Sequence, residues 1–538
     1  MGYFRFGLPR GLGKALVIGV PALFLGVMVV WPVASLLNRS LAGVGAGEAW
    51  AVLSRGSVRS VFGFTIYQAA VSTVVTFVVG LPVAQLVARY KFRGRDLLRA
   101  VAVVPFVLPT VVVASAFVEL FDRVFPGSNR SLLAIVAAHV FFNIAIVIRV
   151  VGGFWATADS RMQEAAAVLG AGRWGRFWSV EFPRLAPVLA AAGAVVFLFS
   201  FTSFGVIRVL GGPSLATVET EIYRYAVNRG EHDVAAVLAV VQILVVGMLA
   251  VGSAKLQRSA AKHDKGRRRP AAIRVQSWRH RIHIGAVLAL VGVVVGTPLA
   301  ILIEGSFAVD GGHGFDHYRR LAGEVDLLPV TAVEAFGHSL MFAAVAAAIA
   351  TSVAMAAAVA VIRGGRAGRW IEVASLVPLG VSAVTIGFGY VVAFSALDLR
   401  RSIWLVPLAH SVVGLPFVLA SLVPALRSID PQMRESAASL GANPLMVRWA
   451  IDWPLAKPAL ATGAGFAAAV SIGEFGATSF VSRGADSYTA PMAVFRLISQ
   501  PGDALRGQAL ALSVLVGFTV SAIAFAMEWR RGQVGGML

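Results

Sequence analysis

The chain of 538 residues is 58% hydrophobic and only 14% charged, which leaves too few polar side chains to cover a soluble globular protein. It contains no cysteine, so disulfide frameworks, thiolate metal sites and cysteine nucleophiles are excluded. Lys and Arg exceed Asp and Glu by 47 to 27, but they occur in short runs without the interleaved aromatic residues of a nucleic-acid surface. The composition therefore predicts an all-α, polytopic membrane protein that binds no nucleic acid.

Twelve stretches are long and apolar enough to cross a bilayer, which takes roughly 20 helical residues because every backbone amide must be paired within the segment. In chain order they lie near 15–37, 60–88, 98–121, 131–153, 186–207, 233–253, 283–304, 336–362, 372–396, 403–426, 456–480 and 506–528. The first has basic flanks, as a signal peptide has, but its apolar run is longer than usual for one. We therefore expect a retained helix.

The charges of the loops predict which side of the membrane each loop faces. The loops at 89–99, 255–281 and 362–369 are strongly basic, whereas the loops at the opposite ends carry both signs of charge, as Glu219 and Arg224 illustrate. Basic loops remain preferentially in the cytoplasm. We therefore expect a multi-pass protein of the plasma (inner) membrane, with both termini in the cytoplasm.

The second part of the chain repeats the first with an offset of 271 residues. His410 matches His139, and Phe475–Gly476 matches Phe204–Gly205. Six spans per copy return the chain to its starting side, so the repeat is parallel. The predicted parts are a first six-helix half at 1–254 with its core transmembrane domain at about 60–253, a basic cytoplasmic linker at 255–282, and a second half at 283–538 with its core at about 336–528.

Each half carries one amphipathic segment with a glycine in its middle. The segments are "EAAAVLGAGRWGRFWSVEFP" at 164–183 and "ESAASLGANPLMVRWAIDWP" at 435–454. Small residues beside an acid let a short helix approach its neighbours closely, and the glycine lets the chain turn. The large apolar residues and arginines that follow are typical of a plug for a groove on a partner. Helices that lie on the lipid headgroups are the alternative, and the matched duplication favours docking.

These segments resemble the signature loop of type I binding-protein-dependent ABC importer permeases. The family pattern is Glu-Ala-Ala, three residues, Gly, nine residues and Ile-x-Leu-Pro, from which this chain departs only at Ser436, Val180, Phe182 and Trp453. The resemblance implies the type I importer fold, with each loop seated as a coupling helix on a separate ATPase subunit. The residues that it assigns to the loops are Glu164, Ala165, Ala166, Gly170, Trp174 and Pro183 in the first copy, and Glu435, Ala437, Gly441, Met446 and Pro454 in the second.

The resemblance also implies the partners of the chain. They are a homodimer of ABC ATPase subunits, which holds ATP and magnesium, and an extracytoplasmic solute-binding protein. The chain itself has no ATPase site, because "GLPRGLGKA" at 7–15 has the wrong glycine spacing and Ala15 where a phosphate loop needs Ser or Thr. We therefore expect no enzyme activity and no cofactor on this chain.

One chain with both halves is similar to the fused permeases of thiamine and ferric-iron importers. The stretches 139–149, 210–224 and 471–480 are similar to those of thiamine permeases, so thiamine or thiamine pyrophosphate is the first choice of solute. Ferric-iron, sulfate, polyamine and phosphonate permeases share the architecture and stay open. An ion-coupled secondary transporter would need a relay of several intramembrane acids, whereas Glu474 stands nearly alone. A scaffold of an exporter or enzyme complex is a further alternative.

Glu474 is an acid within a predicted membrane span, so its role there needs an explanation. Its counterpart in the first copy is Ser203. The two residues are candidates for the substrate path or for a gate, but we rank a structural hydrogen bond of Glu474 ahead of a substrate contact. We expect His139 and His410 to bond to neighbouring helices, and we expect no metal site.

Overall fold

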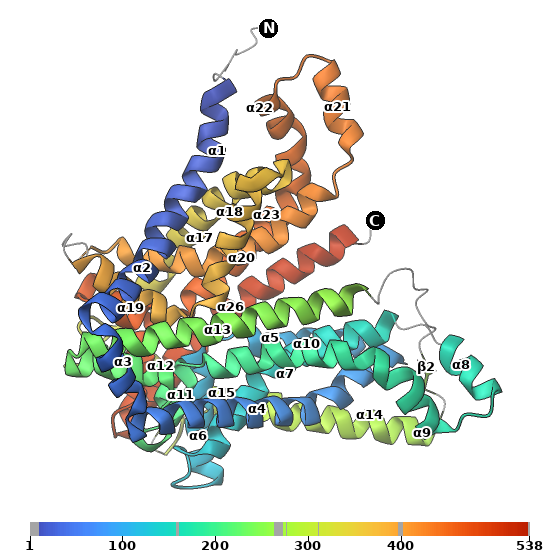
Figure 1. Ribbon diagram of the computed structural model, residues 1–538. Helices are drawn as coiled ribbons and strands as arrows, with labels where there is room; N and C mark the ends of the chain where they lie inside the picture. The colour runs from blue at the N-terminus through green and yellow to red at the C-terminus, as the bar shows by residue number, and fades with distance from the viewer. Residues whose placement is uncertain are drawn as a thin grey trace. The chain divides into compact units, whose positions relative to one another are not determined.

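The computed structural model describes residues 10–157, 161–262, 273–275, 277–309, 311–395 and 402–535. These residues are helical except for turns and two short strand pairs. β1 (Tyr90–Lys91) pairs in parallel with β2 (Ile273–Arg274), and β3 (Ala308–Val309) pairs antiparallel with β4 (Gly312–His313). Ten helices in this described part are long and apolar enough to cross a membrane, and two bent helix pairs raise the number to twelve. The predicted all-α membrane fold is confirmed (Figure 1).

The described helices form two compact units. Unit 1 comprises Met1–Gly45, Leu321–Ala493 and Val516–Leu538, and unit 2 comprises Ala46–Arg320 and Val494–Leu515. The two predicted cores thus fall largely into different units, whereas the first span of each predicted half belongs to the unit that contains the other core. The division into two halves rests on the sequence repeat and stays a prediction.

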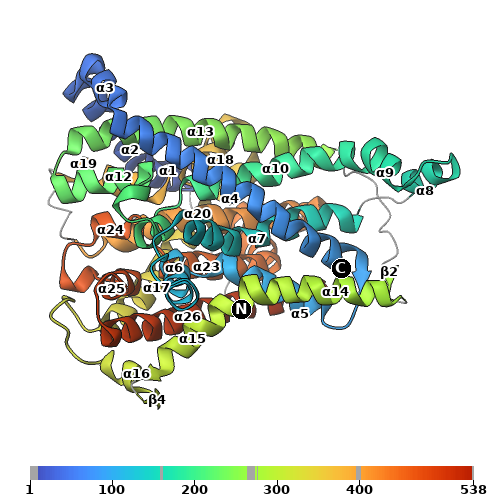
Figure 2. The same cartoon turned by 90° about the horizontal axis from the view of Figure 1, so that it is seen from below.

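Unit 2 is built around α4, which packs along α7 and α10, while α10 packs along α13. α14 packs on α4, and α15 packs on α6. Figure 2 shows the same helices from a second direction. With short π or 3-10 turns labelled η, the elements are α3 (Gly45–Ser54), α4 (Gly56–Arg89), α5 (Arg95–Val107), α6 (Thr110–Val124), α7 (Leu132–Thr157), α8 (Arg161–Val168), α9 (Arg173–Arg176), η3 (Phe177–Glu181), α10 (Phe182–Phe201), α11 (Gly205–Leu210), η4 (Pro213–Leu215), α12 (Val218–Tyr223), η5 (Arg224–Arg229), α13 (His232–Lys262), α14 (Trp278–Val291), η6 (Gly292–Gly296), α15 (Thr297–Phe307) and α16 (Asp316–Arg320).

Unit 1 is built around α17, α20 and α23, which pack on one another. α17 is rich in alanine, and a Cβ atom on Gly463 of α23 would lie only 2.8 Å from the Cα atom of Val418, so small residues set these close approaches. The elements are α1 (Arg10–Leu25), η1 (Gly26–Val30), α2 (Trp31–Asn38), η2 (Arg39–Gly43), α17 (Ala332–Arg363), α18 (Gly365–Gly380), α19 (Ala383–Ala393), α20 (Leu405–Arg427), α21 (Pro431–Ser439), α22 (Pro444–Val447), η9 (Arg448–Asp452), α23 (Trp453–Ile472), α24 (Thr478–Val481) and η10 (Ala485–Ser487). Residues of α25 (Ala490–Ile498) and α26 (Asp503–Gly535) occur in both units.

A proline explains why the first span belongs to unit 1. Pro32 has no N–H group, so the carbonyl of Met28, four residues earlier, loses its helical partner. The hydroxyl of Tyr390 on α19 donates to this carbonyl at 2.9 Å. A Cβ atom on Gly389 would lie 2.9 Å from the Cβ atom of Pro32, so only glycine allows this approach of α2 to α19. In a bilayer, where no water replaces a missing bond, this pairing fixes α2 on α19.

Two predicted spans, 98–121 and 372–396, are wrong as single helices. α5 and α6 are bent by 102° at their junction, and α18 and α19 are bent by the same angle. In the first pair Leu108 is extended, with ψ of 140°, because the following Pro109 disfavours the helical conformation. In the second pair the hydroxyl of Ser382 accepts the N–H of Thr385 at 3.1 Å and begins α19.

The predicted spans 186–207 and 456–480 are too long at their ends. α10 stops at Phe201 and α23 stops at Ile472, and each is followed by a break and a short helix, α11 or α24. α11 packs on α6, and α24 packs on α19. A Cβ atom on Gly205 would lie 2.2 Å from Oγ1 of Thr110, so this glycine is needed for the contact. In each unit a broken helix therefore rests on the second helix of a bent pair.

The predicted linker at 255–282 is only partly described. α13 continues to Lys262, β2 follows at Ile273–Arg274, and α14 begins at Trp278. The linker residues 263–272 and 276 lie outside the described residues, as does residue 396 at the end of a predicted span.

Candidate functional site

The two glycine-hinged loops have the same backbone design. The first loop consists of α8, a turn at Gly170, α9 and η3, and the second of α21, a turn at Gly441, α22 and η9. Gly170 and Gly441 have φ of 84° and 88°, the left-handed region that a side chain rarely adopts. Both loops lead into long helices that carry the predicted Pro183 or Pro454 in their first turn.

Matched hydrogen bonds end the first helix of each loop. The N–H of Gly170 donates to the carbonyl of Ala167 at 3.0 Å, and the N–H of Ala171 donates to the carbonyl of Ala166 at 2.9 Å. This is the Schellman arrangement, which needs a left-handed residue directly after the helix. In the second loop the N–H groups of Gly441 and Ala442 donate to Ala438 and Ala437, both at 3.0 Å. Of the predicted alanines, Ala166 and Ala437 thus serve as acceptors in the turns.

Large apolar side chains of both loops are exposed. Leu169 is 87% exposed and Leu440 is 89% exposed, at matched positions before the glycines. Trp174 and Met446 are 76% and 48% exposed, while Glu164 and Glu435 are also exposed. Apolar groups gathered on short exposed helices mark a surface that a partner or a lipid headgroup layer covers.

Sequence reasoning missed an acid in each loop, although the offset of 271 residues relates the two, Glu181 and Asp452. The carboxylate of Glu181 forms an ion pair with Arg89 at the end of α4, and Nε1 of Trp155 on α7 donates to it at 2.9 Å. The carboxylate of Asp452 accepts from Nε of Arg434 on α21 at 2.7 Å. The first acid therefore ties its loop to two long helices, and the second ties the two ends of its own loop together.

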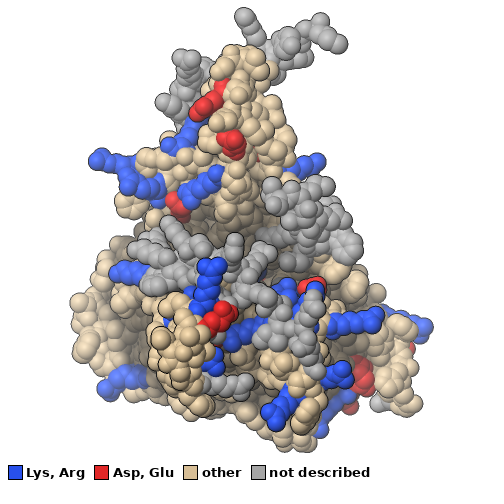
Figure 3. Space-filling view, turned by 90° about the vertical axis from the view of Figure 1, so that its right-hand side faces the viewer, with Lys and Arg blue, Asp and Glu red and all other residues tan. Residues whose placement is uncertain are grey.

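In unit 2, α8 and α9 lie at one end of the long helices, and α3 and α12 lie at the other end (Figures 1 and 2). Figure 3 shows the face of the α8 end, where Lys and Arg side chains predominate over Asp and Glu. An excess of basic residues at one end is the signature of a cytoplasmic side.

The structure places Glu474 in a hydrogen-bonded network at the start of α24. Its buried carboxylate accepts the backbone N–H groups of Ala477 at 2.8 Å and Thr478 at 2.9 Å, and the hydroxyl of Thr478 at 2.6 Å. Nε2 of His410 lies 3.3 Å from the same carboxylate, and Nδ1 of His410 lies 2.8 Å from Oγ of Ser471. Glu474 therefore caps α24 and links it to α20, and His410 links α20 to α23.

The counterpart of this network in unit 2 is polar but has a serine in place of the acid. Ser203 is buried at the position of Glu474. Nδ1 of His139 lies 3.0 Å from Oγ of Ser72 on α4, and the Gln68 amide donates to the carbonyl of Ser200 on α10 at 2.9 Å. Both histidines thus bond to neighbouring helices, as predicted. The two copies differ in the side chains that stabilise the break after α10 and the break after α23.

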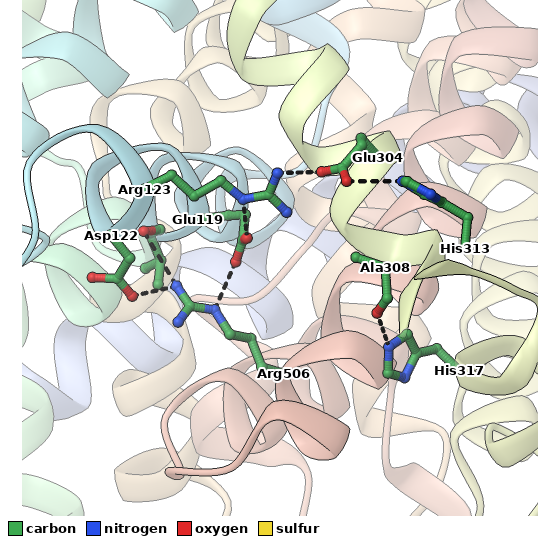
Figure 4. Close-up of polar contacts among 9 residues, drawn as sticks. Glu119, Asp122, Arg123, Glu304, Ala308, His313, His317 and Arg506 are labelled. Carbon is green, nitrogen blue, oxygen red and sulfur yellow. Dashed lines mark hydrogen bonds and ion pairs between the residues drawn. The ribbon is translucent and has the colours of Figure 1, made fainter. Parts of the chain in front are cut away.

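A cluster of charged residues, the outer ionic cluster, joins three helices of unit 2 and was missed by sequence reasoning (Figure 4). Its acids are Glu119 and Asp122 of α6 and Glu304 of α15, and its bases are Arg123 of α6, Arg506 of α26 and His313 of β4. Arg506 pairs with both acids of α6, at 2.7 Å between Nε and Glu119, and Arg123 pairs with Glu119 and Glu304. The residues are far apart in sequence, so only the fold brings them together.

Comparisons with known proteins agree with the architecture. The family model described as a binding-protein-dependent transport system inner membrane component matches residues 77–260, which include the first loop. The sulfate transport system permease protein CysT of Escherichia coli is 30% identical over 247 residues, 44% of this chain and 89% of that protein. The thiamine transport system permease protein ThiP of Escherichia coli is 24% identical over 490 residues, 85% of this chain and 87% of that protein. A probable ABC transporter permease protein, y4fN of Sinorhizobium fredii, is 22% identical over 513 residues, 88% of each chain.

Proposed function

The chain belongs to the family of binding-protein-dependent transport system inner membrane components, and from this premise we propose that its solute is thiamine or thiamine pyrophosphate. As a permease subunit of an ABC importer, it is a multi-pass membrane protein. The observation that supports this choice over sulfate is the length of this chain over which each relative is similar. The thiamine permease is similar over 85% of this chain and therefore contains both halves, whereas the sulfate permease is similar over 44%.

Sulfate is the second candidate solute. The sulfate permease is the more similar protein where it matches, at 30% identity against 24%. Ferric iron, polyamines and phosphonates are further candidate solutes.

We propose that both glycine-hinged loops dock onto separate ABC ATPase subunits, a homodimer, which bind ATP and magnesium. The matched turns and the exposed apolar residues support two equivalent docking surfaces. The ion pair of Glu181 supports a mechanical role of the first loop, since a loop fixed to long helices passes a displacement on to them, and the ion pair of Asp452 holds the second loop together. An extracytoplasmic binding protein delivers the solute at the opposite side.

The orientation is part of the same proposal. Basic residues at the α8 end of unit 2 support a cytoplasmic location of the loops and of the linker. Both termini then lie in the cytoplasm, although residues 1–9 and 536–538 lie outside the described residues.

Uptake by cells tests the solute. In cells that carry the whole importer, we expect deletion of this chain to abolish the uptake of labelled thiamine or thiamine pyrophosphate and to leave sulfate and ferric-iron uptake unchanged. Competition with each unlabelled solute identifies the one that is recognised. Loss of sulfate uptake alone would replace the first candidate by the second.

Replacing Glu474 by Gln is expected to destabilise unit 1 rather than to change which solute is transported. The amide nitrogen of Gln cannot accept the N–H groups that the carboxylate accepts now, and an unpaired buried donor costs about 1–3 kcal/mol. The measurement is the unfolding temperature of the purified chain, with Ser203→Ala at the related position as a control. An unchanged unfolding temperature together with reduced uptake would assign Glu474 to the substrate path instead.

A further inference from the structure

Arg208 is a partly exposed cation on a helix that is otherwise buried. α11 follows the break after α10, and its residues Val206, Ile207, Val209 and Leu210 are all buried. The guanidinium carbon of Arg208 lies 4.9 Å from the ring centroid of Tyr223 and 5.2 Å from that of Phe495. These two aromatic rings, which come from α12 and α25, hold the guanidinium group by cation–π attraction.

The charge of Arg208 is not neutralised by an ion pair with any residue that the structure describes. The acids nearest in sequence on α12 have other partners. Glu221 pairs with Arg224, and the Gln242 amide donates to Glu219. Aromatic rings contact the face of a guanidinium plane, whereas its five N–H donors lie in the plane. Among the described residues, Arg208 has no hydrogen-bond acceptor for these N–H groups, so its donors stay available.

A second arginine lies beside the same helix. A Cβ atom on Gly212, in the turn after α11, would lie 3.5 Å from Cδ of Arg130. Arg130 is exposed and, within the described part of the chain, forms no ion pair with a carboxylate either. Two arginines that have no acidic partner among the described residues thus lie beside α11, and each of them favours an anion.

The repeat shows that packing does not require an arginine at this position. The counterpart of Arg208 by the offset of 271 residues is Ser479, whose hydroxyl donates to the carbonyl of Phe475 at 2.6 Å. A small residue thus fills the equivalent position of the equivalent short helix. A partly exposed arginine that has no ion pair among the described residues, and that the other copy replaces by a small residue, points to a ligand.

We propose that Arg208 binds a tetrahedral oxyanion group of the transported solute, a sulfate or a phosphate. The guanidinium fork matches two oxygens of such a group, and charge-assisted bonds of this kind are among the strongest in proteins. The inference rests on the proposed function as an importer permease and narrows it. It selects thiamine pyrophosphate, sulfate or a phosphonate over thiamine, polyamines and ferric iron.

The test uses four forms of the chain in cells with the whole importer: wild type, Arg208→Met, Arg208→Lys and Arg229→Met. Met keeps an apolar stem against the rings, and Lys keeps the charge without the planar fork. Arg229 is the matched control, because its guanidinium lies 5.0 Å from the Tyr225 ring but also faces Glu231 at 3.8 Å. Immunoblots of membranes confirm equal amounts of each form.

Uptake of labelled thiamine pyrophosphate, thiamine and sulfate is then measured. We expect Arg208→Met to lower uptake of the phosphorylated solute or of sulfate by about tenfold or more, since bonds to a charged group are worth roughly 1.5–3 kcal/mol. We expect Arg208→Lys to be intermediate and Arg229→Met to match wild type.

The outcomes separate the two proposals. Uptake of unphosphorylated thiamine that depends on the chain but not on Arg208 would overturn the oxyanion site and leave the proposed function intact. Sulfate uptake that depends on Arg208 would support the site and overturn thiamine as the solute. If no uptake depends on the chain, both proposals fall. A lipid phosphate is the other source of an oxyanion. Stabilisation of the purified chain by phosphatidylglycerol that Arg208→Met abolishes, with uptake unchanged, would overturn a solute site.

Discussion

Replacing both Glu164 and Glu435 by Lys is expected to abolish solute uptake while the chain still inserts in the membrane and unfolds at nearly the wild-type temperature. Both glutamates are exposed on short helices, Glu164 in the first turn of α8 and Glu435 beyond the first turn of α21. In the chain alone, the change at Glu164 reverses a favourable interaction with the helix dipole, which is worth about 0.3–1 kcal/mol, whereas Glu435 lies beyond the turn where this interaction acts. In a groove of an ATPase subunit, a reversed charge leaves a buried partner unpaired and costs about 2–5 kcal/mol.

The measurements are uptake, ATP hydrolysis by the assembled importer, and the unfolding temperature of the purified chain. We expect hydrolysis to persist without transport, because the proposed importer has its ATPase sites on separate subunits. Glu48→Lys is the control, since Glu48 is also an exposed acid in the first turn of a short helix, α3. Normal uptake by the double variant would show that the loops do not dock through these acids.

The repeat and the hydrophobic stretches made the positions of the spans and of both loops predictable from the sequence. Gly170 and Gly441 were identified as turn residues from their spacing alone, and both have the left-handed backbone that a Schellman turn needs. The same offset relates Glu181 to Asp452, so these loop acids could have been found as well. Hydrophobicity carries no information on the direction of the chain, however, and the bends at Leu108–Pro109 and Ser382 have apolar residues on both sides.

Contacts between distant parts of the chain could not be predicted in this way. The first span packs on Gly389 and Tyr390, because Pro32 leaves the carbonyl of Met28 without a helical partner and Tyr390 donates to it. Only the fold shows that these residues are neighbours. Glu474 could be ranked as a structural residue, but its four donors come from α20 and from the chain after α23. The outer ionic cluster joins residues that lie more than 380 positions apart, as the contact of Arg506 with Asp122 illustrates.

Replacing Arg506 by Met is expected to cause the largest loss of stability of any single change in the outer ionic cluster. Asp122 loses its partner in the cluster, and Glu119 keeps only Arg123. The side chains of Arg506 and Asp122 are 29% and 25% exposed, so the cost lies between that of an exposed pair and that of a buried one. We expect the free energy of unfolding to fall by about 2 kcal/mol, against roughly 0–1 for exposed and 3–5 for buried pairs.

Thermal unfolding of the purified chain measures this loss, and a double-mutant cycle with Asp122→Asn tests its cause. If the cluster acts through charge pairing, removing the acid as well as the base restores part of the stability, with a coupling energy of at least about 0.5 kcal/mol. Arg319→Met is the matched control, because Arg319 is 80% exposed and faces Asp316 at 3.5 Å. Strict additivity of Arg506→Met and Asp122→Asn would mean that the arginine acts through its packing alone. If Arg506→Met lost no more stability than Arg319→Met, the cluster would not hold α26 to α6.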